Sequence, residues 1–168
     1  MKFVSVKLKT LVGSFLTVTA LSLAQSALAA PAVELLSKVE IDKVIVNKDG
    51  TKETKRIVAK KVAPDGEVIY TTTFKNIIDK SVGNIAITNA IPANTAYIAD
   101  SATGDNTDIT FSVDGGKTYN KPENLKIISA EGKERPALAA DYNAIRWAYK
   151  GNLDAGKSGA AIFKAKVK

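Results

Sequence analysis

Four aspartates between residues 100 and 114 are the side chains best suited to hold a metal ion: Asp100, Asp105, Asp108 and Asp114. Carboxylate oxygens are ligands that Ca²⁺ prefers. Their spacing does not follow the Asp-x-Asp-x-Asp-Gly pattern, and no glutamate stands at the twelfth place of such a loop. We therefore predict a solvated loop. The alternative function is a carbohydrate- or calcium-binding module that uses Asp105, Asp108 and Asp114.

The same segment continues into Ser-Val-Asp-Gly-Gly-Lys-Thr-Tyr, residues 112–119. This stretch is similar to the aspartate box of sialidase propellers, with Tyr119 in place of tryptophan. In those enzymes the box shapes a hairpin away from the active site and repeats once per blade, whereas this chain holds one copy. We predict a hairpin turn in which Asp114 accepts backbone N–H bonds while Gly115 and Gly116 adopt positive φ.

Two absences restrict the catalytic chemistry that this chain can perform. The sequence contains no Cys and no His, which excludes disulfides, thiolate nucleophiles, Ser-His and Cys-His catalysis, and zinc sites made of those residues. The Ser-x-x-Lys, P-loop and dinucleotide-binding glycine motifs are absent as well. Glu131, Glu134 and Asp141 are acids without a spacing that aims them at one another. We predict no catalytic residue, no cofactor and no enzymatic activity.

A pair of aromatic residues near the C-terminus, Trp147 and Tyr149, could serve as a platform for a sugar ring. They alternate with Ile145 along a strand pattern, and alternate residues of a strand share one face of a sheet. We therefore predict that Trp147 is buried in the core.

The first thirty residues have the layout of a secretory signal peptide. Its basic start consists of Lys2, Lys7 and Lys9. An apolar stretch follows at 11–23, and Ala27-Leu28-Ala29 supplies the small residues of a cleavage site. We predict a signal at 1–29, cleavage before Ala30, and a single domain at 30–168. Because the apolar stretch is shorter than a membrane span, we expect a secreted protein, periplasmic or extracellular, with no span after cleavage.

The basic residues of the mature chain are dispersed rather than gathered on one face. The formal net charge is +7, of which the three signal-peptide lysines account for three, leaving about +4. The densest basic stretch runs through Lys52–Arg56, Lys60 and Lys61, and lysines along an exposed strand protect its edge from pairing. A nucleic-acid surface needs a basic groove with interleaved aromatics, so we predict that nucleic acid is not a partner.

Short stretches of alternating apolar and polar residues, separated by turn signals, recur throughout the mature chain. We expect strands at 39–45, 57–62, 67–75, 85–87, 97–99, 109–113, 145–149 and 162–167. Asp49-Gly50 and Asp65-Gly66 are turn dipeptides between them. No stretch keeps a 3.6-residue apolar period for three turns. The pattern predicts an all-β fold, an immunoglobulin-like antiparallel β-sandwich with Greek-key connections and about seven to nine strands.

The order of these signals resembles the conserved-repeat immunoglobulin-like family, the eleventh of the domains catalogued as of unknown function. Residues 62–70, Val-Ala-Pro-Asp-Gly-Glu-Val-Ile-Tyr, are similar to its opening pattern, and Phe74-Lys75-Asn76 to its strand that ends in Asn. Residues 85–97 resemble its central pattern, and Ile145-Arg146-Trp147 with 152–156 its late one. The resemblance covers about residues 35–167.

Three positions depart from that family's pattern. Asn89 stands where the family has Asp, Asp65 intrudes before Gly66, and Asn94 replaces Gly. The matching residues are mostly turn and core residues, so the resemblance is stronger evidence for the fold than for the function. Family members occur as modules, commonly in tandem, in secreted and surface proteins of bacteria and archaea, whereas this chain holds one copy.

Together these observations predict a secreted, non-enzymatic β-sandwich module with a structural or protein-interaction role in the bacterial periplasm or cell envelope. The expected partner is another envelope or extracellular protein, which would bind strand edges or end loops.

Overall fold

The strand patterns that follow residue 30 are realised as an all-β structure. The computed structural model describes residues 31–168, so the predicted signal peptide lies outside the described residues. Within residues 31–168 the strands are β1 (Val33–Val46), β2 (Lys52–Val58), β3 (Glu67–Asn76), β4 (Val82–Gly83), β5 (Ala86–Ala90), β6 (Thr95–Tyr97), β7 (Thr107–Ser112), β8 (Lys126–Ile128), β9 (Glu134–Pro136), β10 (Ala144–Tyr149), β11 (Asn152–Leu153) and β12 (Ser158–Val167).

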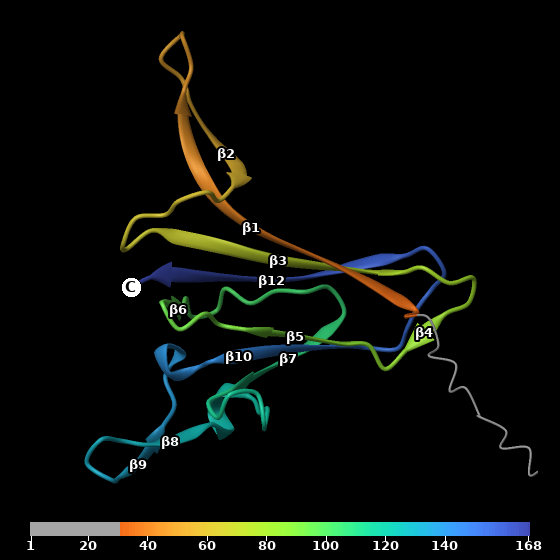
Figure 1. Ribbon diagram of the computed structural model, residues 1–168, viewed down its shortest axis with the longest axis vertical. Helices are drawn as coiled ribbons and strands as arrows, with labels where there is room; N and C mark the ends of the chain where they lie inside the picture. The colour runs from red at the N-terminus through yellow and green to blue at the C-terminus, as the bar shows by residue number, and fades with distance from the viewer. Residues whose placement is uncertain (1–30) are drawn as a thin grey trace, which may run out of the picture. The chain divides into compact units, whose positions relative to one another are not determined.

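Two antiparallel sheets form the body of the protein (Figure 1). One has the strand order β2-β1-β3-β12-β6 and the other β5-β10-β7. The predicted antiparallel β-sandwich is therefore confirmed. Without β2, the two layers contain seven strands, of which the fifth in the chain (β7) and the seventh (β12) have exchanged sheets relative to the order of antibody domains. The seventh strand consequently lies between β3 and β6, where β3 and β12 share the longest ladder of the sandwich.

The number of strands is higher than expected. Twelve strands lie within residues 31–168, against the predicted seven to nine. The additions are mainly β4, β8, β9 and β11, which pair as β11-β4 and β8-β9. Each is two or three residues long, too short to show an alternating pattern. Two single-turn 3₁₀ helices, η1 (Pro122–Asn124) and η2 (Ala139–Asp141), accompany them, and no helix of the described residues is long and apolar enough to cross a membrane.

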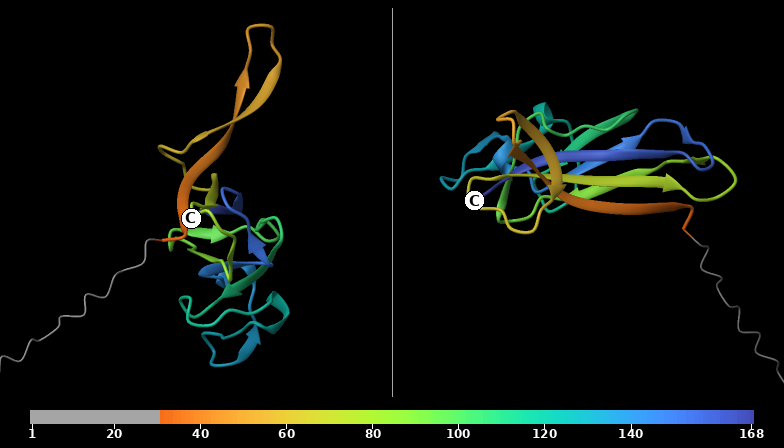
Figure 2. Two further views of the ribbon diagram at one scale, coloured as in Figure 1. Left: turned by 90° about the vertical axis from the view of Figure 1, so that its right-hand side faces the viewer. Right: turned by 90° about the horizontal axis from the view of Figure 1, so that it is seen from above.

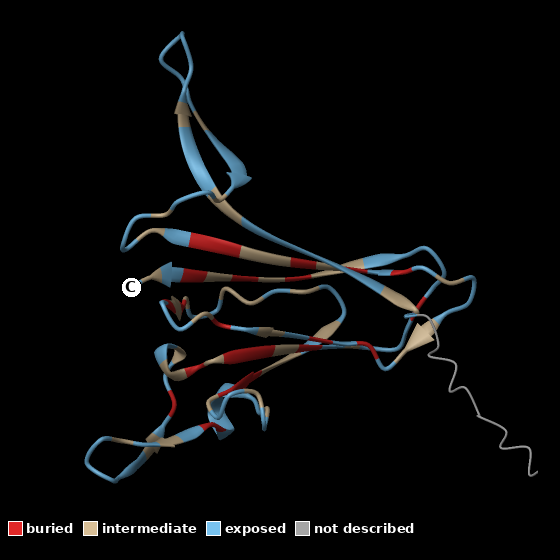
Figure 3. Cartoon of the chain, in the orientation of Figure 1, coloured by how far each residue is buried: buried red, intermediate tan, exposed pale blue. Residues whose placement is uncertain are grey.

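The core lies between the two sheets, as the buried segments in Figure 3 show. Trp147 of β10, Phe74 of β3 and Phe163 of β12 are each 0% exposed. The Tyr70 ring stacks on Phe163 with centroids 4.7 Å apart. The prediction that Trp147 is a core residue is confirmed, and its ring is not available as a sugar platform.

The first hairpin is confirmed, but its return strand is placed differently from the prediction. Gly50 has φ +85° in the turn, and β2 begins at Lys52 and ends at Val58, whereas the alternation predicted 57–62. The reason is the register: Val46 already pairs with Lys52, directly after the turn. From Ala59 on, the chain crosses to β3 instead of continuing the ladder.

Candidate interaction surface

The long strand β1 belongs to the sandwich in its first half and leaves it in its second half. Residues Val33–Glu40 pair with β3, and residues Glu40–Val46 pair with β2. The partner therefore changes at Glu40, and the β1-β2 hairpin projects away from the two layers (Figures 1 and 2). We refer to residues 40–58 as the arm. Among the described residues, no third strand pairs with the arm beyond Glu40.

The arm exposes apolar side chains that a folded protein usually covers. Val44, Val46 and Val58 are 58%, 62% and 65% exposed. Alternate residues of a strand share one face, so Glu40, Asp42 and Val44 lie on the same face of β1. Val58 lies opposite Glu40 in the β1-β2 ladder and therefore shares this face. Ile57, paired with Ile41 on the opposite face, is 38% exposed. The arm thus carries apolar residues on both faces, and neither face is covered by another layer.

Polar contacts hold the arm in its ribbon form. Arg56 Nε donates to Asp42 Oδ1 at 2.9 Å, and Arg56 Nη2 donates to Asp42 Oδ2 at 3.2 Å across the two strands. This bidentate hydrogen bonding lowers the pKa of Asp42 below its ordinary value. At the tip, the Thr51 hydroxyl and backbone N–H both donate to Asp49 Oδ1. The pairs are exposed to solvent, so they set the register of the ribbon rather than stabilise it strongly.

The outer edge of β1 before the arm is open. Ile77 N–H donates to Ala32 O, so the backbone of Ala32 faces β3. Along an antiparallel strand, successive residues direct their backbone N–H and C=O groups to opposite sides. Even-numbered residues of β1 therefore bond to β3, and odd-numbered residues direct their N–H and C=O groups away from it. On that side Ala59 N–H donates to Val39 O. Residues 33–38 have no strand beside them within the described part of the chain.

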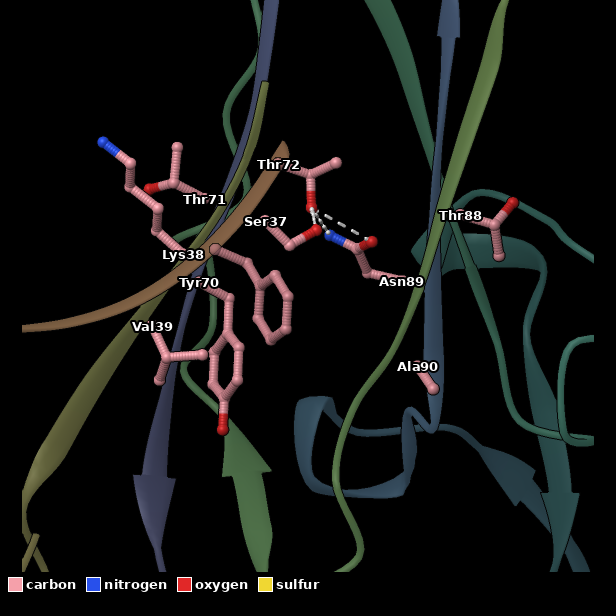
Figure 4. Close-up of a pocket in the computed structure, with 10 residues that line it drawn as sticks. Ser37, Lys38, Val39, Tyr70, Thr71, Thr72, Thr88, Asn89 and Ala90 are labelled. Carbon is pink, nitrogen blue, oxygen red and sulfur yellow. Dashed lines mark hydrogen bonds between the residues drawn. The ribbon is translucent and has the colours of Figure 1, made fainter. Parts of the chain in front are cut away.

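Beside this edge, the two sheets enclose a hollow of about 200 Å³ between β1, β3 and β5 (Figure 4). Ser37 Oγ and Thr72 Oγ1 share a hydrogen bond of 3.1 Å, and Asn89 Nδ2 donates to Thr72 Oγ1 at 3.0 Å. These three side chains link β1 and β3 to β5 of the opposite sheet. None of them titrates near neutral pH, so the trio bonds the layers and offers no general base.

The structure confirms the predicted turn at Asp114. Its carboxylate accepts the backbone N–H groups of Lys117 and Thr118 and the hydroxyls of Ser112 and Thr118. Gly115 and Gly116 have φ of +78° and +85°. The Thr118 N–H and hydroxyl, with the Ser112 hydroxyl, hold the pKa of Asp114 far below its ordinary value. The turn therefore gains stability from this carboxylate above the pKa of an unfolded Asp and loses it only in strong acid.

The other aspartates of the 100–114 segment are not gathered around one point. Asp108 Oδ1 lies 3.1 Å from Lys150 Nζ, and Asp105 is exposed. Within residues 31–168, no group of three or more acidic side chains is arranged to hold a metal ion. No contact in this segment favours the carbohydrate- or calcium-binding alternative.

We expect thermal melting curves in EDTA and in millimolar CaCl₂ to overlay. Calcium at a hundredfold excess over Kd would stabilise the native state by about 2.7 kcal/mol. Asp105→Asn and Asp108→Asn are expected to change the free energy of unfolding by no more than about 0.5 kcal/mol. Asp114→Ala should lower Tm by several degrees in both buffers because the turn loses its acceptor. A calcium-dependent rise in Tm that Asp105→Asn abolishes would show that the loop is a metal site.

The three acids considered for catalysis have different surroundings in the structure. Arg135 donates both guanidinium ends to the Asp141 carboxylate, at 2.8 and 3.0 Å, and Lys126 Nζ donates to Glu134 Oε2 at 2.9 Å. Each of these two acids therefore faces a cation and not another carboxylate. Glu131 is exposed at the β8-β9 hairpin.

The sequence located the first strand and the turn of the arm, but it placed the return strand too late and missed the separation of the arm from the sandwich. The sequence contained one signal of this separation. Apolar residues occupy both odd and even positions of the strand, Ile41 and Ile45 on one face and Val44 and Val46 on the other. A strand with one solvated face shows a single parity. Apolar residues at both parities indicate that neither face is an ordinary solvated face.

Comparison of the chain with protein-family models, curated proteins and solved structures finds no match.

Proposed function

We propose that the mature chain is a non-enzymatic protein-interaction module of the periplasm or cell envelope, and that it binds another envelope or extracellular protein through the arm. The single observation that carries this proposal is the arm itself, a two-stranded ribbon with exposed apolar residues on both faces. The resemblance to the conserved-repeat immunoglobulin-like family supports the same role, because that family supplies modules of secreted and surface proteins.

A ribbon of this kind gains its full stability only when it is covered. A single two-stranded hairpin is marginally stable in water, and a hydrophobic face needs a third strand or another layer. The arm has no such layer within its own chain, while Val44, Val46 and Val58 remain more than half exposed. Exposed apolar patches with polar surroundings are typical of surfaces that bind a partner. The missing layer is therefore supplied by the partner.

The charge around the base of the arm indicates the chemistry of that partner. The arm itself holds five Lys and Arg against four Asp and Glu, and Lys38, Lys60 and Lys61 beside it raise the balance between residues 38 and 61 to eight against four. This segment therefore carries about the whole net positive charge of the mature chain. Lys52 and Lys55 lie on β2, the outermost strand of its sheet, as expected for an edge protected by lysine. The partner surface that fits the arm has an apolar centre and an acidic rim.

Site-specific photocrosslinking in the native host tests the proposal. The full chain is expressed with a photoreactive phenylalanine in place of Val46 on the arm, or in place of Glu131 on the β8-β9 hairpin as a matched exposed control. We expect a discrete crosslinked protein, identified by mass spectrometry, from position 46 and none from position 131. Equal products from both positions, or none from position 46, would contradict the proposal.

A second variant separates binding from folding. Val44→Thr, Val46→Thr and Val58→Thr together keep the β-branched shape of each side chain and remove its apolar surface. Because these residues are exposed and cover no core residue, each change is expected to alter the free energy of unfolding by no more than about 0.5 kcal/mol. When a photoreactive residue at Lys55 reports the contact, the triple variant should lose the crosslink while keeping the Tm of the parent.

A further inference from the structure

We infer that the open edge of β1 pairs with the same edge of a second copy, so that two chains form a two-fold symmetric dimer with a sheet running from one copy into the other. This inference goes beyond the proposed function, since it concerns the edge of β1 beside the arm and not the arm itself. The segment involved is Glu34–Lys38, which has no strand on its outer side within the described residues.

The edge has the features of a pairing strand, and Lys38 is the only lysine among its residues 33–39. Native proteins block exposed edges with proline, bulges or inward-pointing charges. Residues 33–39 contain no proline, and their inward positions are Val33, Leu35, Ser37 and Val39, none of them charged. Leu35 and Leu36 are each 57% exposed on opposite faces of the strand. The unpaired groups of Leu35 and Ser37 point outward, toward a neighbouring strand.

Charge complementarity selects a second copy and a single register. When two copies of the edge run antiparallel about an axis at Leu36, Glu34 of each chain lies opposite Lys38 of the other. An axis at Ser37 would place Glu34 opposite Glu40, and an axis at Leu35 would place Glu34 opposite Leu36. Opposite charges across a strand pair stabilise it, whereas like charges destabilise it. The Leu36 register therefore forms two ion pairs, because the two-fold axis repeats the pair between Glu34 of one copy and Lys38 of the other.

The same register satisfies the backbone and the apolar side chains. Leu35 of one chain and Ser37 of the other become a hydrogen-bonded pair, and the two-fold axis repeats it, which gives four N–H···O bonds. The two Leu36 side chains meet at the axis as a closely spaced, non-hydrogen-bonded pair. On the face toward the core, the two Leu35 side chains, one from each copy, are diagonal neighbours across the strand pair and close enough to make contact. An interface of this size is a weak one, so dimerisation is expected at high protein concentration.

Sedimentation equilibrium of the purified mature chain over a wide concentration range tests the inference. We expect the weight-average mass to rise from one chain toward two. Glu34→Lys and Lys38→Glu, made singly, should each weaken the dimer about tenfold because both cross-strand pairs become like-charged. The double exchange, Glu34→Lys with Lys38→Glu, should restore the affinity of the parent.

The double exchange also controls for effects within one chain. Glu34 lies opposite Lys75 of β3 within one chain. Glu34→Lys therefore places two lysines opposite each other in the monomer, whether or not residue 38 is changed. Only the contact between copies is repaired by the second substitution. Leu35→Pro gives an independent check, because its N–H points away from β3 and its loss leaves the β1-β3 ladder intact. This variant should be monomeric with a Tm close to that of the parent.

Two results would overturn the dimer. One is a parent chain that remains a monomer at every concentration, and the other is a double exchange that dimerises no better than the single variants. A monomeric parent that still crosslinks another protein through Val46 would leave the proposed function in place and remove only the dimer.

Discussion

Trp147→Ala is expected to lower the free energy of unfolding by about 3–5 kcal/mol. The side chain is 0% exposed, its ring centroid lies 6.2 Å from that of Phe163, and its Nε1–H donates to Thr103 O at 3.0 Å. The alanine variant therefore loses the burial of a large ring and one of the two hydrogen bonds that Thr103 O accepts, and it leaves a cavity. Because a domain is stable by about 5–15 kcal/mol, urea unfolding monitored by circular dichroism should show a large fall in the midpoint.

Two controls accompany this measurement. Leu138→Ala removes a side chain that is 63% exposed and should change stability by no more than about 0.5 kcal/mol. In the parent protein, Trp147 is the only tryptophan, so its emission should be blue-shifted and poorly quenched by acrylamide. Strong quenching in the folded state would place the ring at the surface and contradict the sandwich core.

Asn76→Asp is expected to cost roughly 2–4 kcal/mol, although the two side chains have the same shape. Asn76 is 0% exposed at the end of β3. Its Nδ2 donates to Lys80 O and Leu153 O, both at 2.8 Å, and its Oδ1 accepts Ile78 N–H at 3.0 Å. An aspartate oxygen at the Nδ2 position would face two carbonyl oxygens with no proton to donate. The amide thus links β3 to the following loop and to β11.

The comparison variant is Asn106→Asp, because Asn106 Nδ2 makes a similar bond to Lys150 O at 2.7 Å but is exposed. That change is expected to cost about 0.5 kcal/mol or less, since water replaces the lost donor. The loss in Asn76→Asp should shrink at acidic pH, because the buried carboxyl has a raised pKa and its protonated form can donate one bond. Stability in chemical denaturant, measured at acidic and neutral pH, checks both expectations. A cost below about 1 kcal/mol at neutral pH would show that this amide is not an essential link.

The elements of the sandwich were predicted well where a long strand alternates over most of its length, although Ile69 of β3 is buried on the opposite face. In β3, Val68, Thr72 and Phe74 are buried on the predicted face, because a period of two is visible over ten residues. The turns at Gly50 and Asp114 were predicted because their chemistry is local: a positive φ and a carboxylate that bonds residues three and four places ahead. The pairs β4-β11 and β8-β9 were not predicted, since strands of two or three residues contain no period.

The sequence by itself determined the all-β class, the burial of Trp147 and the hairpin turns, because alternation and turn chemistry act between residues that are close in the chain. Tertiary structure alone decided which strands become neighbours. The placement of β12 between β3 and β6, the bonds of Asn76 to Leu153 O, and the open edge at residues 33–38 all depend on contacts between distant segments. Alternation reports that a strand has a buried face, but it does not report what buries that face. For the same reason, only the folded chain shows that β1 changes partner at Glu40 and that the arm beyond it lacks a covering layer.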